Sequence, residues 1–250
     1  MDVIEIAPNL HMLRLETRQA YLWHEVRSAT LIDTGIAGSG SAITGLLTEL
    51  GIDLERIVIT HGHEDHVGSA AELRAATGAP VLAHGADAPV VRGERKKAEP
   101  VLLDWERPLL EGINPNVPPA PPCPVDHELG DGDVLDFAGG ARVISIPGHT
   151  DGSIAVYLSK SRILFTGDTI ANVGELMLGT FTVDRARTIE SFHRLAELDT
   201  EVACFGHGEP ISSKAGAELR AVAQKTHDVA HNSSAFTETT PPYSCWSWTP

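Results

Sequence analysis

The chain has 250 residues, of which 42% are hydrophobic, which is enough for one substantial core and predicts one domain of two or more layers. Its 34 acidic and 19 basic residues give a formal net charge of -15, which disfavours nucleic acid as a partner because such a chain repels phosphate backbones. Three scattered cysteines, an N-terminus without a basic start, and no apolar run of roughly 20 residues argue against a disulfide framework, a signal peptide and a membrane span, and favour a cytoplasmic protein.

The first 50 residues have the pattern of a β meander followed by a helix. Short segments that alternate or run apolar predict strands at residues 3–6, 10–15, 20–24 and 29–32. Apolar side chains at helical spacing predict a helix over residues 41–50, which Gly51 ends.

The next part of the chain alternates between strand and helix. A short apolar strand is expected at residues 57–59, a helix at residues 68–77 and another strand at residues 81–83. This alternation indicates α/β packing.

Residues 86–124 differ from the rest because they contain a charged run at 92–97 and six prolines between 115 and 124. One interpretation is a surface insertion, since long loops in compact domains are often linkers. The other is a lid or substrate wall, in which Trp105 could reach a ligand.

The remaining chain returns to strands and helices. Strands are expected at residues 134–137, 142–146, 154–158, 162–165 and 202–205, and helices at 184–198 and 214–230. A single domain is therefore expected to span residues 1–231. The Ser/Thr/Pro-rich tail at 232–250 reads as a flexible terminus, although its aromatic residues leave open a docked tail or a homo-oligomer contact.

The most specific feature of the sequence is the segment His61-Gly62-His63-Glu64-Asp65-His66. In an extended segment His61 and His63 point to the same side, so both imidazoles can bind one metal ion. Asp65 and His66 project differently and can serve a second ion. A polar loop of capping residues is the alternative, but three of the chain's 12 histidines within six positions favour a zinc-type site of imidazole and carboxylate ligands.

Other candidate ligands lie where an apolar strand stops. His61, His149, Asp168 and His207 each follow such a run, and Asp33 follows residues 30–32 in the same way. Taken singly, Asp168 and His207 have the local sequence of turn or cap residues. Their recurrence after strands predicts that they converge at one edge of a sheet, where α/β proteins place their sites.

These motifs resemble the metallo-beta-lactamase superfamily. The resemblance rests on His-x-His-x-Asp-His at 61–66, Pro-Gly-His-Thr at 147–150, Gly-Asp-Thr at 167–169, Gly-His-Gly at 206–208 and Leu-Ile-Asp-Thr-Gly at 31–35, which occur in the family's order. It covers about residues 30 to 210 and implies a four-layer αβ/βα sandwich with the metals at one edge of its two sheets.

The resemblance also implies a role for each matching residue. His61, His63 and His149 would bind a first metal ion, and Asp65, His66 and His207 a second. Asp168 would bridge the two ions, and Asp33 would orient ligands through hydrogen bonds. The expected cofactor is two zinc ions per chain, with iron or manganese as alternatives. Asp65 would also orient the attacking water and take its proton.

Several residues of the sequence argue against particular branches of this family. True β-lactamases of this fold resemble one another in having Cys or Ser at the position of Asp168, whereas a bridging aspartate resembles glyoxalase II, lactonases and RNase Z. The negative charge and the lack of a basic arm disfavour RNase Z. The basic residues that glyoxalase II uses for glutathione have no clear match, since Lys214, Arg220 and Lys225 read as ordinary helix surface. The substrate tyrosine of the acyl-homoserine lactonases is not placed either.

The resulting prediction is a metal-dependent hydrolase that cleaves a small-molecule ester, thioester or lactone. Two alternatives remain: a mononuclear iron enzyme resembling persulfide dioxygenases, and a catalytically inactive member that binds a ligand. Ordinary core packing is the alternative for the apolar residues that follow Asp168. The residues predicted to line the substrate pocket are Leu176, Met177, Leu178, Phe181 and Trp105.

Overall fold

The computed structural model describes residues 1–15, 18–113 and 117–231, and its strands form two main sheets. The first sheet has seven strands, which run antiparallel from β1 to β4 and parallel from β4 to β7. In order across the sheet they are β1 (Asp2–Ala7), β2 (Leu10–Leu15), β3 (Arg18–His24), β4 (Ser28–Ile32), β5 (Asp53–Ile59), β6 (Val81–His84) and β7 (His127–Leu129).

The second sheet has five strands, and a separate two-stranded hairpin accompanies it. Its strands, in order across the sheet, are β14 (Val202–Cys204), β11 (Ile163–Phe165), β10 (Ile154–Leu158), β9 (Ala141–Ser145) and β8 (Val134–Leu135). The hairpin consists of β12 (Ile170–Val173) and β13 (Glu175–Leu178).

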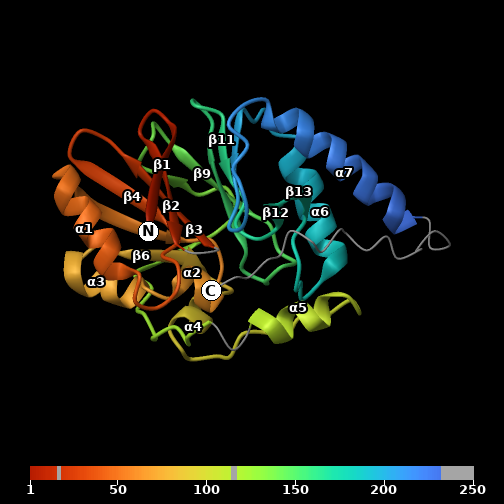
Figure 1. The fold of residues 1–250 in the computed structure, drawn as a ribbon, viewed down its shortest axis with the longest axis horizontal. Helices are drawn as coiled ribbons and strands as arrows, with labels where there is room; N and C mark the ends of the chain where they lie inside the picture. The colour runs from red at the N-terminus through yellow and green to blue at the C-terminus, as the bar shows by residue number, and fades with distance from the viewer. Residues whose placement is uncertain (16–17, 114–116, 232–250) are drawn as a thin grey trace.

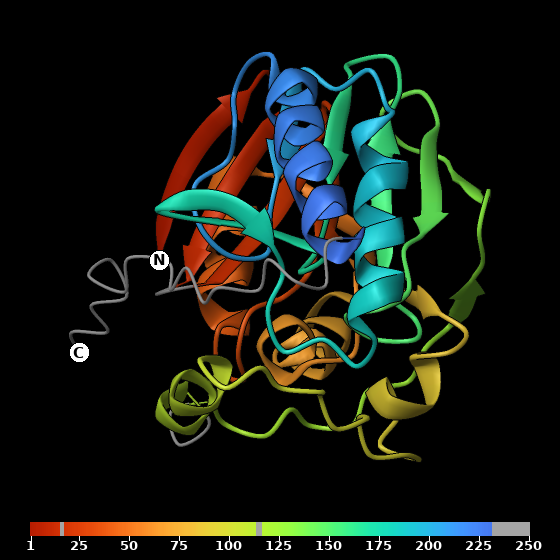
Figure 2. The same cartoon turned by 90° about the vertical axis from the view of Figure 1, so that its right-hand side faces the viewer.

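Helices cover the outer face of each main sheet (Figure 1). The first sheet carries α1 (Gly40–Leu50) and α3 (Ala70–Thr77). The second carries α6 (Arg185–Ala196) and α7 (Ala215–His231), which lie side by side in Figure 2. Two short helices, α4 (Ala88–Val91) and α5 (Glu106–Ile113), lie at the lower edge in Figure 1, and the short helix α2 (Glu64–Val67) lies above α4.

The alternation of side chains along the strands explains the four layers. In β5, Ile57 and Ile59 pack toward α1 and α3, whereas Val58 packs between the two sheets. In β10, Val156 packs between the sheets and Tyr157 packs toward α6 and α7. Since successive side chains of a strand point to opposite faces, apolar residues at every position require a cover on both faces. The predicted four-layer αβ/βα sandwich is therefore confirmed.

Most predicted elements are present, and two have the predicted bounds, at residues 10–15 and 154–158. The predicted helix over 68–77 is wrong at its start, because α2 precedes it and α3 begins only at Ala70. β7 and the β12–β13 hairpin were not predicted, since strands of three or four residues carry little periodicity. The extent of the domain over residues 1–231 stays a prediction, and the tail at 232–250 lies outside the described residues.

Within the residues that the structure describes, no helix is both long and apolar enough to cross a membrane.

Candidate metal centre

The seven predicted ligand side chains lie together at one edge of the two sheets. His61 follows β5, His149 follows β9, Asp168 follows β11 and His207 follows β14. The remaining three, His63, Asp65 and His66, lie in and just before α2. Because four of these residues directly follow strands, the sheets bring side chains from distant parts of the chain to one place.

Three histidines form a first group that could hold a metal ion. The candidate ligand atoms of His61, His63 and His149 all lie within 4.8 Å of one another. His63 Nδ1 is 3.0 Å from His149 Nε2, and the centroids of the three rings are 4.7 Å apart in each pair. Three imidazole nitrogens that converge in this way form a ligand set that zinc uses in proteins.

Asp65, His66 and His207 form a second such group, and Asp168 lies between the two groups. Asp168 Oδ2 is 3.1 Å from His207 Nε2 and 3.7 Å from His149 Nε2, while Asp168 Oδ1 is 3.3 Å from His66 Nε2. One carboxylate therefore approaches nitrogens of both groups, which is the geometry expected of a bridging ligand.

Hydrogen bonds outside the centre orient the histidine rings. Asp33 Oδ2 is 2.8 Å from His66 Nδ1, and the same carboxylate accepts hydrogen bonds from the Thr60 backbone N–H and hydroxyl. Thr60 Oγ1 donates to Asp33 and is therefore left to accept from His61 Nδ1, 3.0 Å away. With Nδ1 donating to these oxygens in both rings, Nε2 is the nitrogen that each ring turns toward the centre. Asp33 thus has the orienting hydrogen bonds expected for it.

His149 is held in the same manner from another segment. Its Nδ1 is 3.0 Å from the backbone carbonyl of Thr180, which accepts a hydrogen bond from the Nδ1–H group and leaves Nε2 as the nitrogen that can bind a cation. Thr180 belongs to the loop after β13, so this loop helps to set the orientation of a ring that is 31 residues away in the sequence.

The protonation state of the three histidines in the first group, and an unsatisfied nitrogen among them, both suit the binding of a metal ion. Burial lowers the pKa of all three rings, to about 4 for His63, to about 3 for His149, and well below the ordinary value for His61. All three are therefore neutral at pH 7, as a metal ligand must be. His61 Nε2 is buried and makes no hydrogen bond within the described residues, an arrangement that is costly unless a cation satisfies the nitrogen.

The second group carries positive charge that a metal ion would replace. Burial alone lowers the pKa of His207, but the carboxylates of Asp168 and Asp65 outweigh burial and raise it to about 10. For His66, the carboxylates of Asp168, Asp33 and Asp65 likewise outweigh burial and raise the pKa well above its ordinary value. These rings must release protons before they bind a metal, and the carboxylates that hold the protons favour a divalent cation in the same place.

Replacement of Asp33 is expected to weaken the metal centre. Asp33→Ala removes the acceptor for three hydrogen bonds and should raise the metal Kd by about 10- to 100-fold, the usual effect of losing a group that orients a ligand. Competition with a chromophoric chelator measures this Kd. Because Asp33 has φ of 59°, a conformation that Asn tolerates better than Ala, Asp33→Asn is the matched variant and should show a smaller rise. An unchanged Kd in Asp33→Ala would contradict this role.

Arg18 is a residue of the site that the sequence did not reveal. It begins β3, its side chain is 2% exposed, and its Nε lies 3.3 Å from Asp65 Oδ2. An arginine two residues before the apolar run at 20–23 was the available signal. Its charge is permanent, so this ion pair restrains one oxygen of the Asp65 carboxylate.

A cavity opens beside the centre, and its walls combine ligands with apolar side chains. His63, Asp65 and Asp168 line the cavity, as does Arg18. The 86–124 insertion provides one wall through residues 97–100 and α5. The apolar residues that line it are Ala98, Pro100, Leu110, Ile113, Val117, Ala171, Met177 and Phe181.

The structure separates the residues predicted for the substrate pocket. Met177 and Phe181 line the cavity, whereas Leu176 and Leu178 pack against the apolar layer under α6 and α7. Strand alternation in β13 explains the division, because neighbours of Met177 point to the other face. Trp105 precedes α5 and is not among the described residues that line the cavity.

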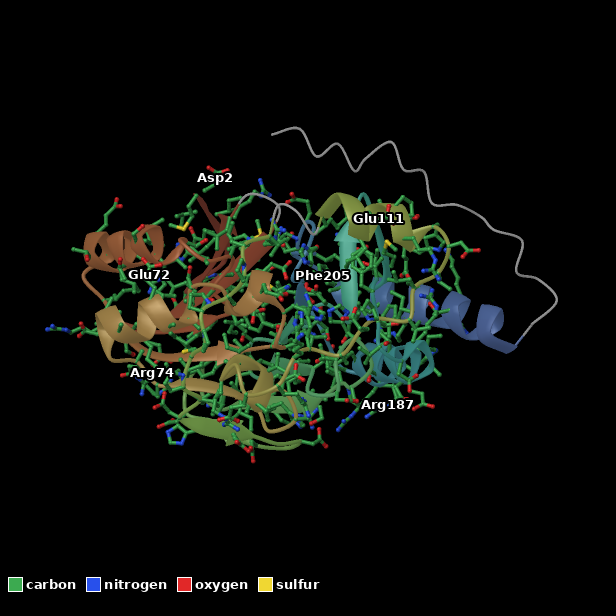
Figure 3. All side chains as sticks on the ribbon, turned by 90° about the horizontal axis from the view of Figure 1, so that it is seen from below. Asp2, Glu72, Arg74, Glu111, Arg187 and Phe205 are labelled. Atoms are coloured by element: carbon green, nitrogen blue, oxygen red, sulfur yellow. The ribbon has the colours of Figure 1, made fainter. Side chains whose placement is uncertain are left out.

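The view from below labels Phe205 and Glu111, which lie on segments that border the site (Figure 3). Phe205, which is fully buried, lies near the middle of the molecule and directly precedes the turn that carries His207. Glu111, on α5, is exposed at the edge. The centre is thus anchored to the core on one side and faces α5 on the other.

Comparison with known proteins identifies the family. The model of the metallo-beta-lactamase superfamily matches residues 17–207. A probable metallo-hydrolase of Bacillus subtilis (strain 168) is 28% identical over 232 residues, covering 84% of this chain and 88% of that protein. The hydroxyacylglutathione hydrolase of Rhodobacter capsulatus is 31% identical over 197 residues, covering 77% of this chain but only 63% of that protein's length.

A solved structure agrees with these matches. A metallo-beta-lactamase family protein of Thermus thermophilus superposes with a TM-score of 0.66 at 26% identity, covering 90% of this chain and 81% of that chain. The chain has the fold of this solved structure, the family model matches residues 17–207, and the histidine and aspartate groups lie close together. The chain therefore belongs to the metallo-beta-lactamase superfamily.

Proposed function

We propose that this metal-dependent hydrolase holds two divalent metal ions, most simply zinc, and cleaves a small-molecule ester, thioester or lactone. The observation that carries the proposal is the pair of three-residue groups with Asp168 between them. In this proposal His61, His63 and His149 hold one ion, and Asp65, His66 and His207 hold the other. Asp168 contributes to both.

In the proposed hydrolysis, the metal ions and the side chains around them have separate roles. When bound, two metal ions lower the pKa of a water molecule and polarise a carbonyl oxygen. Asp65 orients the attacking water and accepts its proton, since its carboxylate borders the cavity and is fixed by Arg18. His61, His66 and His149 are buried, and the exclusion of bulk water around them strengthens every electrostatic interaction there.

The cavity walls support an acyl compound as the substrate. Leu110, Ile113 and Phe181 offer an apolar surface directly beside the centre, which suits an acyl group better than a highly charged one. The similarity to hydroxyacylglutathione hydrolases also favours a thioester. The β-lactamases of this fold resemble one another in having Cys or Ser at the position of Asp168. The aspartate in this chain therefore disfavours β-lactam hydrolysis.

The metal content of the purified protein tests the proposal. We expect about two zinc ions per chain by elemental mass spectrometry when no metal is added, together with hydrolysis of at least one substrate in a panel of thioesters, lactones and esters. About one iron per chain, with oxygen consumption on persulfides, would replace this proposal with the mononuclear dioxygenase. Two bound metal ions without turnover of any ester, thioester or lactone would favour a ligand-binding role.

Removal of the metal is expected to abolish activity and to destabilise the fold. Dialysis against a chelator should remove hydrolysis, and stoichiometric zinc should restore it. The melting temperature should also fall, because an ion that binds only the folded state stabilises it by mass action, by about 4 kcal/mol at a metal concentration 1,000 times the Kd. Calorimetry on the metal-free and reloaded protein measures the shift. Full activity after verified metal removal would exclude metal catalysis.

A further inference from the structure

We propose that Asp87 is a positioning residue for the first metal group, because its carboxylate ties together the two loops that carry His61, His63 and His149. The inference rests on the proposed metal centre and adds a residue that neither the sequence motifs nor the family match assigns. Asp87 lies at the start of the 86–124 insertion, outside all the motif segments.

The side chain of Asp87 does not serve its own helix. Asp87 is the residue before α4 and its backbone carbonyl accepts from Val90 and Val91, so it has the position of a helix cap. An aspartate there normally accepts hydrogen bonds from the first turn of the helix. Asp87 makes no such bond, and its side chain, which is 4% exposed, turns toward the ligand loops instead.

Three hydrogen bonds join the Asp87 carboxylate to those loops. The backbone N–H of Gly62, between the two histidines of the first loop, donates to Oδ2 at 2.8 Å. From the second loop, Thr150 Oγ1 donates to Oδ2 at 2.7 Å and the backbone N–H of Gly152 donates to Oδ1 at 3.0 Å. Thr150 directly follows His149. One ionised group therefore accepts from both sides of the three-histidine group.

Close packing makes this link rigid. A Cβ atom on Gly152 would lie 2.6 Å from both the Asp87 backbone nitrogen and Oδ1, so only glycine allows the approach. On the other loop, a Cβ on Gly62 would lie 3.2 Å from Val90 of α4. The start of the insertion is thus wedged against both ligand loops, and charge-assisted hydrogen bonds to backbone N–H groups fix their separation.

The consequence concerns metal affinity. His63 and His149 come from segments 86 residues apart, and their facing nitrogens lie 3.0 Å apart. Coordination tolerates little change in this separation. Loss of the Asp87 link frees the two loops to move independently, and we expect the affinity for one of the two metal ions to fall by about 10- to 100-fold.

The variant Asp87→Asn tests this role. It keeps the volume of the side chain, but its NH2 group then faces one of the backbone N–H donors. Chelator competition on the metal-free protein, with circular dichroism to verify folding, should resolve both zinc-binding steps. We expect the Kd of one zinc ion to rise by about 10- to 100-fold. Both Kd values within about threefold of the wild type would overturn the inference.

A matched control separates positioning from general stability. Asp126 also accepts a backbone N–H, from Val81, and pairs with Arg74 at 2.7 Å, but it is not part of the metal centre. Asp126→Ala should lower the melting temperature and leave both zinc Kd values unchanged. A purely structural Asp87 would behave like Asp126.

A second variant keeps the test decisive if Asp87→Asn does not fold. Thr150→Val removes one of the three hydrogen bonds and should raise one zinc Kd by roughly fivefold, the value of a single hydrogen bond. No change in that variant would overturn the inference. A wild-type protein that binds no zinc would overturn the proposed function and this inference together, whereas normal wild-type binding with unchanged variants would overturn the inference alone.

Discussion

Asp168→Ala is expected to reduce the bound metal from about two ions to about one per chain and to lower kcat/KM by about 10³-fold. Asp168 is 12% exposed, and its Oδ2 lies within 3.8 Å of the Nε2 atoms of His61, His149 and His207. Its loss removes the one negative charge that both groups share. A metal ion used as a Lewis acid contributes several kcal/mol to the reaction, and about 1.4 kcal/mol corresponds to a tenfold rate.

Elemental mass spectrometry after gel filtration counts the metal, and steady-state kinetics on the best substrate of the panel gives kcat/KM. The control is Asp131→Ala, which removes a carboxylate that accepts from the Ser145 backbone N–H and pairs with Arg194 outside the metal centre. That variant should keep two metal ions and wild-type turnover. Two bound metal ions per chain and full activity in Asp168→Ala would contradict the proposal of a binuclear centre.

Gly206→Ala is expected to disrupt the centre without changing any proposed ligand. A Cβ atom on Gly206 would lie 2.0 Å from Asp168 Oδ1 and 2.7 Å from His66 Cε1, so the carboxylate must move. A displacement of about 1 Å at a catalytic centre lowers the rate by about 10²-fold, which is the loss of kcat/KM expected here. Overpacking should also cost about 1–3 kcal/mol of stability, seen as a lower melting temperature.

Gly45→Ala provides the matched control for this substitution. Gly45 lies within α1, and an added Cβ would meet no atom within 4 Å. The same change should therefore stabilise the protein by up to about 1 kcal/mol, through helix propensity alone, and leave kcat/KM unchanged. Wild-type metal content and activity in Gly206→Ala would show that the Asp168 carboxylate does not need the position it has in the structure.

The residue types of the candidate ligands and their places after apolar strands could be predicted from local pattern, whereas the four layers were predicted through the resemblance to the metallo-beta-lactamase superfamily, and the structure shows the physical reason for them. Apolar residues at every position of β10 require a cover on two faces wherever the strand lies. A histidine or aspartate directly after an apolar strand is brought to the sheet edge by the strand itself, as with His149 and Asp168. These features need no knowledge of which distant segments meet.

The walls of the cavity could not be predicted in the same way. Residues 176–178 read as one apolar run, but in β13 Met177 faces the cavity and its neighbours face the layer under α6 and α7. The β12–β13 hairpin that creates this division was not recognised, since each strand has only four residues. Burial alone does not say which face of a short strand meets a ligand.

The sequence by itself determined the α/β packing, the residue types of the candidate ligands and the order of the segments that carry them, because strand periodicity and residue type are local properties. Only the tertiary structure decided which side chains support those ligands. Arg18 meets Asp65 across 47 residues, and Asp87 meets Thr150 across 63. Neither has a periodicity or spacing that relates it to its partner, since the contact exists only after the sheets and the insertion have packed. Side chains that position a site from distant segments are therefore fixed by packing, which no local pattern encodes.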